Sequence, residues 1–488
     1  MLKNRFVYLL LGITLLLGFI VRVYRVDQIL GFYFDQGRDG SVIWDLFHKG
    51  KFFLIGPVTG IEGIFRGPWY YWLIAPFYFL GKGNPVWPSV FLALTTVVAA
   101  FIAYKIGEKI SGKTAGIIAA TIASFSYYLV YASRWLSNPT PMLLISMLLV
   151  WLMLIASKKK WWVYPLIGFL VGQAMQFGSA AEVFYIPAVA IFLIWQRKNL
   201  NLKVLVLSGI AFLIPFLPQI VFDFKHQHIL FNNIKKFFLA DQSFKMSFWQ
   251  VVKIRIPFYY DVFTSKIWLG EKKLLQAFLL FALIFLVIKF KEIWSKKGFR
   301  ILLLMFVSPL IGMLFFQGNY GNIYDYYFTG YYLIFVLIFS ILLSSLSKNI
   351  LGKIVLVFFL FFFLKINLPL VRNYIVSGVD GPTTVAFGNQ KQAIDWIYKD
   401  ANGKPFNVDV YVPPVIPYAY NYLFTWLGTT KYKQLPLEEN IPLLYTLYEV
   451  DPPHPERLDA WMKKQKGIGK IIKEETFGGI TVQRRLRF

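Results

Sequence analysis

The sequence predicts a polytopic α-helical membrane protein that ends in a small α/β domain. Of the 488 residues, 57% are hydrophobic and only 16% are charged, whereas about a quarter of the residues in soluble domains are charged. Apolar stretches of about twenty residues recur along the chain, and each is long enough to cross roughly 30 Å of hydrocarbon. The composition changes after residue 371, where shorter helical and strand-like patterns replace the long apolar stretches.

The membrane part is predicted to cross the bilayer about eleven times. The predicted spans are 6–26, 86–105, 114–132, 139–156, 161–177, 180–195, 204–222, 273–290, 300–316, 328–346 and 351–371. Lysine and arginine gather in every second connection, whereas the short turns near 178 and at 317–327 contain neither. Because positively charged loops stay on the cytoplasmic side, we expect a multi-pass protein of the plasma (cytoplasmic) membrane with a cytoplasmic N-terminus and an external C-terminal domain.

The overall charge and the cysteine count exclude several other classes. The net charge is +26, and such a charge could indicate a nucleic-acid partner. Many of the lysines and arginines, however, lie between the apolar segments, as expected for the loops of a membrane protein. No nucleic-acid partner is therefore predicted. The chain has no cysteine, so it can form neither a disulfide nor a thiolate metal site. Lys3, Arg5 and the apolar run after them resemble a signal peptide, but no small-residue cleavage site follows. An uncleaved first helix is predicted.

Two domains are predicted, at 1–371 and 372–488. The first contains the membrane spans and a large outer loop at 27–85. Within it, Pro68 to Leu80 is too short to span and is expected to lie at the interface or to re-enter the membrane, and 223–271 is expected to lie along the membrane surface. In the second domain the residue pattern predicts helices at 389–400, 417–427 and 455–465, and strands at 406–412, 443–450, 468–475 and 478–486.

The candidate site lies in the first outer loop, between Phe34 and Pro68. This loop begins Phe34-Asp35-Gln36-Gly37-Arg38-Asp39 and ends Arg66-Gly67-Pro68-Trp69-Tyr70-Tyr71-Trp72. Two carboxylates and two arginines are therefore expected to lie next to apolar and aromatic segments. Ionisable groups beside a bilayer are costly to keep there and mark a functional site.

One carboxylate with nearby arginines suits one kind of group transfer. Glycosidases need two carboxylates because a sugar leaving group must be protonated. A phosphate leaving group is already a good anion, so one base for the attacking hydroxyl and cations for the departing phosphate are enough. Asp35 as the base, with Arg38 and Arg66 on the phosphate, fits this chemistry, because an aspartate with its ordinary pKa near 3.9 is ionised at neutral pH.

These motifs, directly after the first span, resemble those of the integral-membrane GT-C glycosyltransferases. The similarity is to the family 39-like branch, which contains the protein O-mannosyltransferases and the lipid A aminoarabinose transferases. Tyr131-Ala132-Ser133-Arg134-Trp135 before Asn138-Pro139 resembles the outer end of the third span in the same group. The resemblance covers roughly residues 1–371.

The resemblance implies an activity as well as a GT-C fold. It implies inverting transfer, in a single displacement, of a hexosyl or pentosyl group from a polyprenyl-phosphate donor to an acceptor outside the cytoplasm, which could be protein, lipid or glycan. It also implies that Asp35 is the general base.

The sequence departs from the family pattern at two points. The usual Asp-Glu pair is Asp35-Gln36 here, so the second carboxylate is absent unless Asp39, one helical turn further on, replaces it. The His or Lys before the proline turn is replaced by Arg66-Gly67. No cofactor or metal site is predicted, although a divalent cation stays an alternative.

Further residues complete the candidate site. The predicted catalytic carboxylates are Asp35 and Asp39. The predicted contacts of the donor phosphate are Arg38, Arg66, Arg134, Lys225 and His226. The predicted lining of the substrate pocket is Trp69, Tyr70, Asp325 and Tyr326.

Two other functions compete with glycosyl transfer. One is a transporter or lipid flippase, but such proteins often have inverted repeats and broken helices at the midplane, and no repeat is visible here. The other is an enzyme like the O-antigen ligases or polymerases, which place their key groups in a later loop. The sequence does not distinguish which sugar is moved.

Overall fold

The computed structural model describes residues 4–59, 63–239, 246–316, 321–347, 350–379, 381–413 and 416–488. Parts of several predicted segments lie outside these residues. They are 60–62 of the first outer loop, 240–245 of the surface stretch, 317–320 of an outer turn, and 348–349, where a cytoplasmic loop is predicted.

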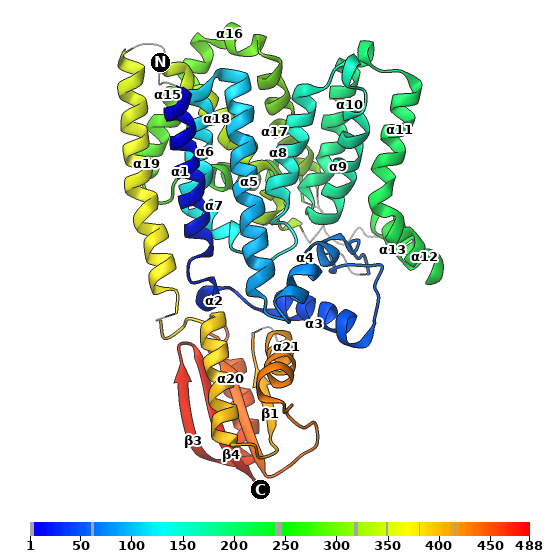
Figure 1. Ribbon diagram of the computed structural model, residues 1–488, viewed down its shortest axis with the longest axis vertical. Helices are drawn as coiled ribbons and strands as arrows, with labels where there is room; N and C mark the ends of the chain where they lie inside the picture. Colours follow the sequence, from blue (N-terminus) through cyan, green and yellow to red (C-terminus); the bar gives the residue numbers. More distant parts are fainter. Residues whose placement is uncertain are drawn as a thin grey trace.

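The membrane part is a bundle of roughly parallel helices, with the N-terminus at one end and the smaller C-terminal domain at the other (Figure 1). The helices of the bundle are α1 (Asn4–Val23), α5 (Val86–Ser111), α6 (Lys113–Phe125), α7 (Tyr127–Ser133), α8 (Met142–Ile155), α9 (Val163–Phe177), α10 (Tyr185–Trp195), α11 (Leu202–Leu213), α15 (Lys272–Ile288), α17 (Lys297–Phe315), α18 (Tyr332–Leu346) and α19 (Ile350–Ser377). Each of the eleven predicted spans is therefore helical, and α19 continues past the predicted domain boundary at 371.

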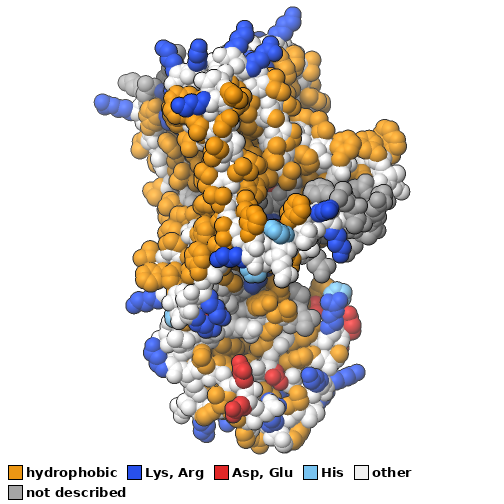
Figure 2. All heavy atoms as spheres, turned by 90° about the vertical axis from the view of Figure 1, so that its right-hand side faces the viewer, with side chains coloured by type: hydrophobic (Ala, Val, Ile, Leu, Met, Phe, Trp, Pro, Cys, Tyr) orange, Lys and Arg blue, Asp and Glu red, His pale blue; other side chains and the backbone are white. Residues whose placement is uncertain are grey.

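The helix lengths and the surface fit a membrane protein. In the described residues, six helices are long and apolar enough to cross a membrane, and the bent pair α6–α7 would be a seventh. Helices at 142–155, 163–177 and 181–195 are apolar but shorter, so the count of eleven crossings stays a prediction. Hydrophobic side chains cover the surface between the two ends, and lysine and arginine crowd the end at the top (Figure 2).

The span predicted at 114–132 is broken rather than continuous. Helices α6 and α7 meet at an angle of 62°, with Ser126 between them. Arg22 of α1 lies against this break, where its guanidinium donates hydrogen bonds to the carbonyls of Ala123 (2.6 Å) and Ser124 (2.9 Å) at the end of α6. These carbonyls have no partner within the helix, so Arg22 acts as the C-terminal cap of α6.

The prediction of a loop from residue 34 to 68 was wrong for its first half, because Phe34–Lys49 forms helix α3. The side chain of Gln36 accepts a hydrogen bond from the backbone N–H of Tyr33 (3.1 Å), which satisfies a free donor at the helix start. Asp35 in the first turn suits the positive end of the helix dipole. Gly50, with a φ of 64°, ends the helix in the left-handed conformation.

Short helices lie where the bundle meets the C-terminal domain, which is named the outer domain after its predicted side (Figure 1). They are α2 (Val26–Ile29), α4 (Trp69–Leu80), α12 (Leu217–Lys225) and α13 (Ile229–Leu239). The longer helix α14 (Phe248–Thr264) contacts α17. In α4, the predicted interfacial helix, Tyr70 and Tyr71 are buried inside the protein, while Trp69 and Trp72 are partly exposed. At the opposite end, α16 (Phe290–Ser295) connects α15 to α17.

The outer domain has the predicted α/β pattern. Its elements are α20 (Phe387–Ala401), β1 (Asn407–Tyr411), α21 (Tyr418–Leu427), the following π-helical turn η7 (Gly428–Tyr432), β2 (Leu443–Glu449), α22 (Pro455–Lys466), β3 (Gly469–Phe477) and β4 (Ile480–Arg487). The sheet order is β1-β2-β4-β3, with β1 parallel to β2 and the other two pairs antiparallel. α21 lies between the sheet and α3 and leads from the outer domain to the candidate site (Figure 1).

Candidate active site

Helix α3 presents Asp35, Arg38 and Asp39 together, because side chains three and four residues apart are neighbours on a helix. Arg38 Nη1 lies 2.8 Å from Asp35 Oδ1. Its Nη2 and Nε lie 2.8 and 2.9 Å from Asp39 Oδ1. One guanidinium therefore bridges both carboxylates that the sequence singled out.

The two carboxylates differ in their access to solvent. The side chain of Asp35 is 56% exposed, and that of Asp39 is 6% exposed. Asp39 Oδ1 also accepts a hydrogen bond from Tyr71 Oη of α4 (2.8 Å). Burial raises the pKa of Asp39 to about 6, against the opposing effects of Arg38 and Tyr71. Asp35 is thus open to solvent, while Asp39 contacts Arg38 from its buried side.

Arg66 reaches the same site from the segment before α4. It is close enough to Glu182, Tyr326 and Asp35 to interact electrostatically with each of them. Its Nη1 donates a hydrogen bond to the carbonyl of Phe177 at the end of α9 (3.3 Å). Burial lowers the pKa of the guanidinium, but an arginine stays protonated in proteins. Arg38 thus lies between the two carboxylates, and Arg66 is near enough to Asp35 for an electrostatic interaction.

The segment that carries Arg66 is held by hydrogen bonds to three side chains, one each from α9, α12 and α13. Gln176 accepts a hydrogen bond from the Gly67 N–H (2.7 Å), and a Cβ at Gly67 would overlap the same amide side chain. Gln219 of α12 donates to the Phe65 carbonyl (2.8 Å), and Asn233 of α13 donates to that of Gly63 (2.9 Å). The absence of a side chain at Gly67 thus lets the segment lie against α9.

Glu182 belongs to the site but was not among the predicted site residues. It is fully buried in the 3₁₀ helix Ala181–Phe184, and it accepts hydrogen bonds from the N–H groups of Ser179 (2.6 Å) and Gly330 (3.2 Å). The spacing Ser179-x-x-Glu182 is that of a capping box, which marks a helix start in the sequence. Only the fold places this carboxylate beside Arg66.

Asp325 and Tyr326 begin a 3₁₀ segment, Asp325–Tyr331, at the outer end of α18. Tyr326 lies near Arg66, and its ring packs edge-on against Trp135 (5.9 Å between centroids). Asp325 is instead paired with Lys266, whose fully buried Nζ lies 2.9 and 3.0 Å from the two carboxylate oxygens. Tyr326 is thus part of the site, whereas Asp325 serves a buried ion pair.

Other predicted residues lie elsewhere. Arg134 is 3% exposed, and it donates hydrogen bonds to the carbonyls of Val21 and Tyr24 (both 2.9 Å), so it caps α1. Lys225 and His226 are exposed at the end of α12, where the His226 ring stacks on Phe222. The structure therefore places none of these three beside Asp35, and their role in phosphate binding stays a prediction.

The two aromatic residues predicted to line the pocket lie behind the site. Trp69 donates its indole N–H to the Pro215 carbonyl (2.7 Å). Tyr70 is fully buried and close enough to Asp39 for an electrostatic interaction. Its hydroxyl has no hydrogen-bond partner among the described residues. Among the described residues, no three His, Asp or Glu side chains form a group that could hold a metal ion.

A buried acid lies where the outer domain meets the start of α3. Glu449 is 6% exposed, accepts a hydrogen bond from Tyr420 Oη (2.9 Å), and lines a small cavity together with Tyr33 and Phe34. Burial raises its pKa to about 7, although Tyr420 and Gln390 oppose the shift. The folded protein thus holds a proton on Glu449 at pH values where the unfolded chain has lost it.

The raised pKa of Glu449 should make the free energy of unfolding fall as the pH rises. Since the pKa is raised on folding, the contribution of Glu449 is complete below about 4.5 and is lost as the pH passes about 7. We expect Glu449→Gln to flatten the decline of the thermal unfolding midpoint between pH 5 and 8, because glutamine carries no charge. The exposed Glu475→Gln variant is the control, and an undiminished decline in Glu449→Gln would assign the effect to other groups.

Comparisons with known proteins give one matching family model and several solved structures of similar fold. Residues 66–222 match the family model described as dolichyl-phosphate-mannose-protein mannosyltransferase. The match begins at Arg66 and does not include α3. No curated protein sequence matches the chain.

Solved structures with the same fold cover almost all of the chain. ArnT from Cupriavidus metallidurans bound to undecaprenyl phosphate matches with a TM-score of 0.60 and 10% identity, over 99% of this chain and 98% of that one. The Archaeoglobus fulgidus oligosaccharyltransferase in its apo form matches with a TM-score of 0.54 and 11% identity, over 96% and 73%. The archaeal oligosaccharyltransferase AglB in complex with an inhibitory peptide and a dolichol-phosphate gives 0.50 and 12%, over the same shares. The predicted resemblance and the predicted fold class are thus confirmed.

Proposed function

We propose that this chain, which has the GT-C fold, is a membrane glycosyltransferase that moves a sugar from a polyprenyl-phosphate donor to an acceptor outside the cytoplasm. The family model matched by residues 66–222 supports glycosyl transfer. A polyprenyl phosphate as the carrier is supported by two proteins of like fold, one bound to undecaprenyl phosphate and the other to a dolichol-phosphate.

The reaction we propose is a single displacement. The acceptor hydroxyl oxygen forms a bond to the anomeric carbon while the bond from that carbon to the phosphate oxygen breaks, so the configuration inverts. Asp35 takes the hydroxyl proton as general base, and the bonding electron pair leaves with the phosphate. Because that leaving group is a stable anion, cations rather than an acid stabilise its departure.

The observation that carries this proposal is the grouping of Asp35, Arg38 and Arg66 at the start of α3. Asp35 is the exposed carboxylate, its partner Arg38 is 17% exposed, and Arg66 approaches from the opposite segment. One accessible base beside two guanidinium groups, which bind phosphate well, is what the displacement needs. Asp39 and Tyr71 hold Arg38 in place on its buried side.

Incubation of the purified full chain with a radiolabelled polyprenyl-phosphate sugar tests the proposal. We expect release of polyprenyl phosphate, with the label passing to an added acceptor or slowly to water. A protein that binds the labelled lipid and moves it between the leaflets of a vesicle without breaking the sugar–phosphate bond would be a flippase, and that result would refute the proposal.

We also propose the topology and the domain division that the sequence predicts, with a cytoplasmic N-terminus, an external second domain at 372–488, and a plasma-membrane location. The two ends of the chain lie at opposite ends of the molecule (Figure 1), as an odd number of crossings requires. A reporter enzyme that is active only outside the cytoplasm is expected to be active when it is fused after Phe488. Activity of a reporter that works only in the cytoplasm would contradict this orientation.

A further inference from the structure

The face of α3 opposite its buried carboxylate is built for close contact with the outer domain. A Cβ at Gly37 would overlap the backbone of Tyr418 and Ala419 at the start of α21. One turn further on, a Cβ at Gly40 would lie 3.0 Å from the Tyr422 ring. Gly37 lies in the sequence between Asp35 and Arg38, so the outer domain touches the helix backbone at the reacting groups themselves.

Helix α21 meets this face with a regular stripe of aromatic residues. Tyr418, Tyr422 and Trp426 are four residues apart and therefore share one side of the helix. The Tyr418 ring packs edge-on against Phe34, with 4.8 Å between centroids. The Tyr422 hydroxyl donates to the Gly83 carbonyl, and the Trp426 indole N–H donates to the Lys82 carbonyl (2.9 Å).

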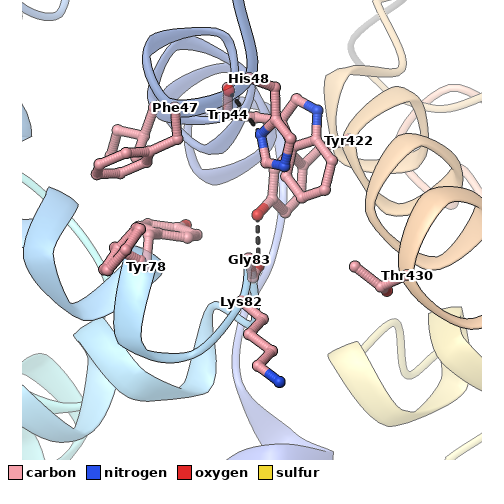
Figure 3. A pocket seen from close by; sticks show the side chains of 10 residues that line it. Trp44, Phe47, His48, Tyr78, Lys82, Gly83, Tyr422 and Thr430 are labelled. Carbon is pink, nitrogen blue, oxygen red and sulfur yellow. Dashed lines mark hydrogen bonds between the residues drawn. The ribbon is translucent and has the colours of Figure 1, made fainter.

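Figure 3 shows this junction from close by, with Trp44 and His48 of α3, Tyr78 of α4 and Tyr422 of α21 around a cavity of about 240 Å³. The Tyr422 ring lies between α3 and α4, with its centroid 6.4 Å from that of Trp44 and 6.1 Å from that of Tyr78. α21 thus contacts α3, α4 and the turn after α4 together.

The chain that leads into α3 is held by the outer domain as well. Phe387 N–H donates to the Leu30 carbonyl (3.0 Å), and the Gln390 side chain donates to the Phe32 carbonyl (2.9 Å). Tyr33 Oη in turn donates to the Val385 carbonyl (3.0 Å).

The start of α3 is also held by polar contacts on the side away from the outer domain. They include the hydrogen bond from Gln36 to the Leu136 carbonyl (2.9 Å) and that from Tyr71 to Asp39. The position of Asp35 relative to Arg66 is therefore set by both parts of the molecule.

We propose that the outer domain is a positioning element of the active site: α21, seated on Gly37 and Gly40, fixes α3 and so sets where Asp35 and Arg38 stand relative to Arg66. The catalytic part of this inference rests on the proposed function. The contact of Gly37 is with backbone atoms, so no side-chain movement can make room for a Cβ there. The contact of Gly40 is with a ring, which can shift.

Three glycine-to-alanine variants of the full chain test the proposal. Gly37→Ala forces α21 away from α3, Gly40→Ala displaces only the Tyr422 ring, and Gly209→Ala in α11 is the control, because a Cβ there meets no atom within 4 Å. Alanine is the better helix former, so any loss comes from the contact. We expect kcat to fall on the order of 10²-fold in Gly37→Ala, as displaced catalytic groups do, less in Gly40→Ala and not in Gly209→Ala.

Two readouts separate a positioning role from a folding defect. The kcat should fall more than the KM for the donor rises, because Arg66, one of the two proposed phosphate contacts, is held by α9 and α12 rather than by α21. Amide hydrogen exchange should rise in residues 34–49 of Gly37→Ala while α5 and α18 keep their protection. If Gly37→Ala does not fold, Tyr422→Phe, which removes only the bond to Gly83, should raise exchange in the same residues.

The exchange measurement needs no substrate, so it tests the contact even if the proposed reaction is wrong. A wild-type protein that does not cleave the donor would refute the function alone. Exchange in residues 34–49 that is as slow in Gly37→Ala as in Gly209→Ala would refute the positioning role. Equal kcat in these two variants, in a preparation that turns over donor, would refute it too.

Discussion

Asp35→Asn is expected to fold and insert normally and to lose glycosyl transfer by ~10²–10⁴-fold, the range typical of a lost general base. Asparagine keeps the size of the side chain and an oxygen for Arg38, but it cannot take a proton from the acceptor. The carboxylate is the exposed one of the pair, so its removal costs little stability. Initial rates with a labelled polyprenyl-phosphate sugar measure the effect.

Two variants of the same helix serve as controls. Asp45→Asn removes a carboxylate that pairs with Lys49 and Lys51 at the far end of α3, and such solvated pairs contribute little, so transfer should continue. Asp39→Asn should cost less than Asp35→Asn, since Asp39 is buried and acts through Arg38. Near-normal transfer by Asp35→Asn together with an inactive Asp39→Asn would mean that Asp39 is the base.

Arg66→Ala is expected to weaken donor use about 10²-fold, the cost of losing one preorganised group that stabilises charge in a transition state. The guanidinium is the only predicted phosphate contact besides Arg38 that the structure places near Asp35. Both the KM for the donor and kcat should worsen, because the phosphate is charged before and after bond breaking. The thermal unfolding midpoint of the purified variant shows how much of the loss is structural.

Glu182 provides the decisive control for Arg66. The two charges are close, so removal of the arginine leaves a buried carboxylate without its cation, and unpaired buried charges destabilise proteins. The double variant Arg66→Ala/Glu182→Gln removes this penalty. We expect it to regain stability but not transfer; recovery of transfer would show that Arg66 serves only to neutralise Glu182.

Local patterns explain why much of the fold was predictable. The spans follow from apolar length, and the outer domain follows from alternation and turn residues, which depend on neighbouring residues alone. Asp35, Arg38 and Asp39 were predictable as a group because a helix brings such spacings together. The helix itself was missed, since Gly37, Gly40 and the charges lower its helix propensity, and contact with α21 compensates for that.

The rest depended on distant contacts that no local pattern reveals. Arg134 carries the same charge as Arg66, yet it caps α1 because the fold brings it to the carbonyls of Val21 and Tyr24. Asp325 pairs with Lys266, 59 residues earlier in the sequence. The role of Glu182 likewise required the approach of a segment more than a hundred residues away. The type of charge alone could not show which of these residues belong to the candidate site and which stabilise the fold.

The arginine in the break between α6 and α7 has a consequence for biogenesis. Helix α1 leaves the ribosome before α5 and α6, and at that stage the guanidinium of Arg22 has the Gly18 carbonyl of its own helix (2.8 Å) but lacks the partners that α5 and α6 supply. When α6 follows, its last carbonyls find their donors only if α1 is already beside it, since a bilayer core supplies none. Neither helix is satisfied alone in lipid, so pairing of the two must be an early step of insertion. Replacement of α1 by an unrelated signal-anchor would leave later helices inserted but misassembled.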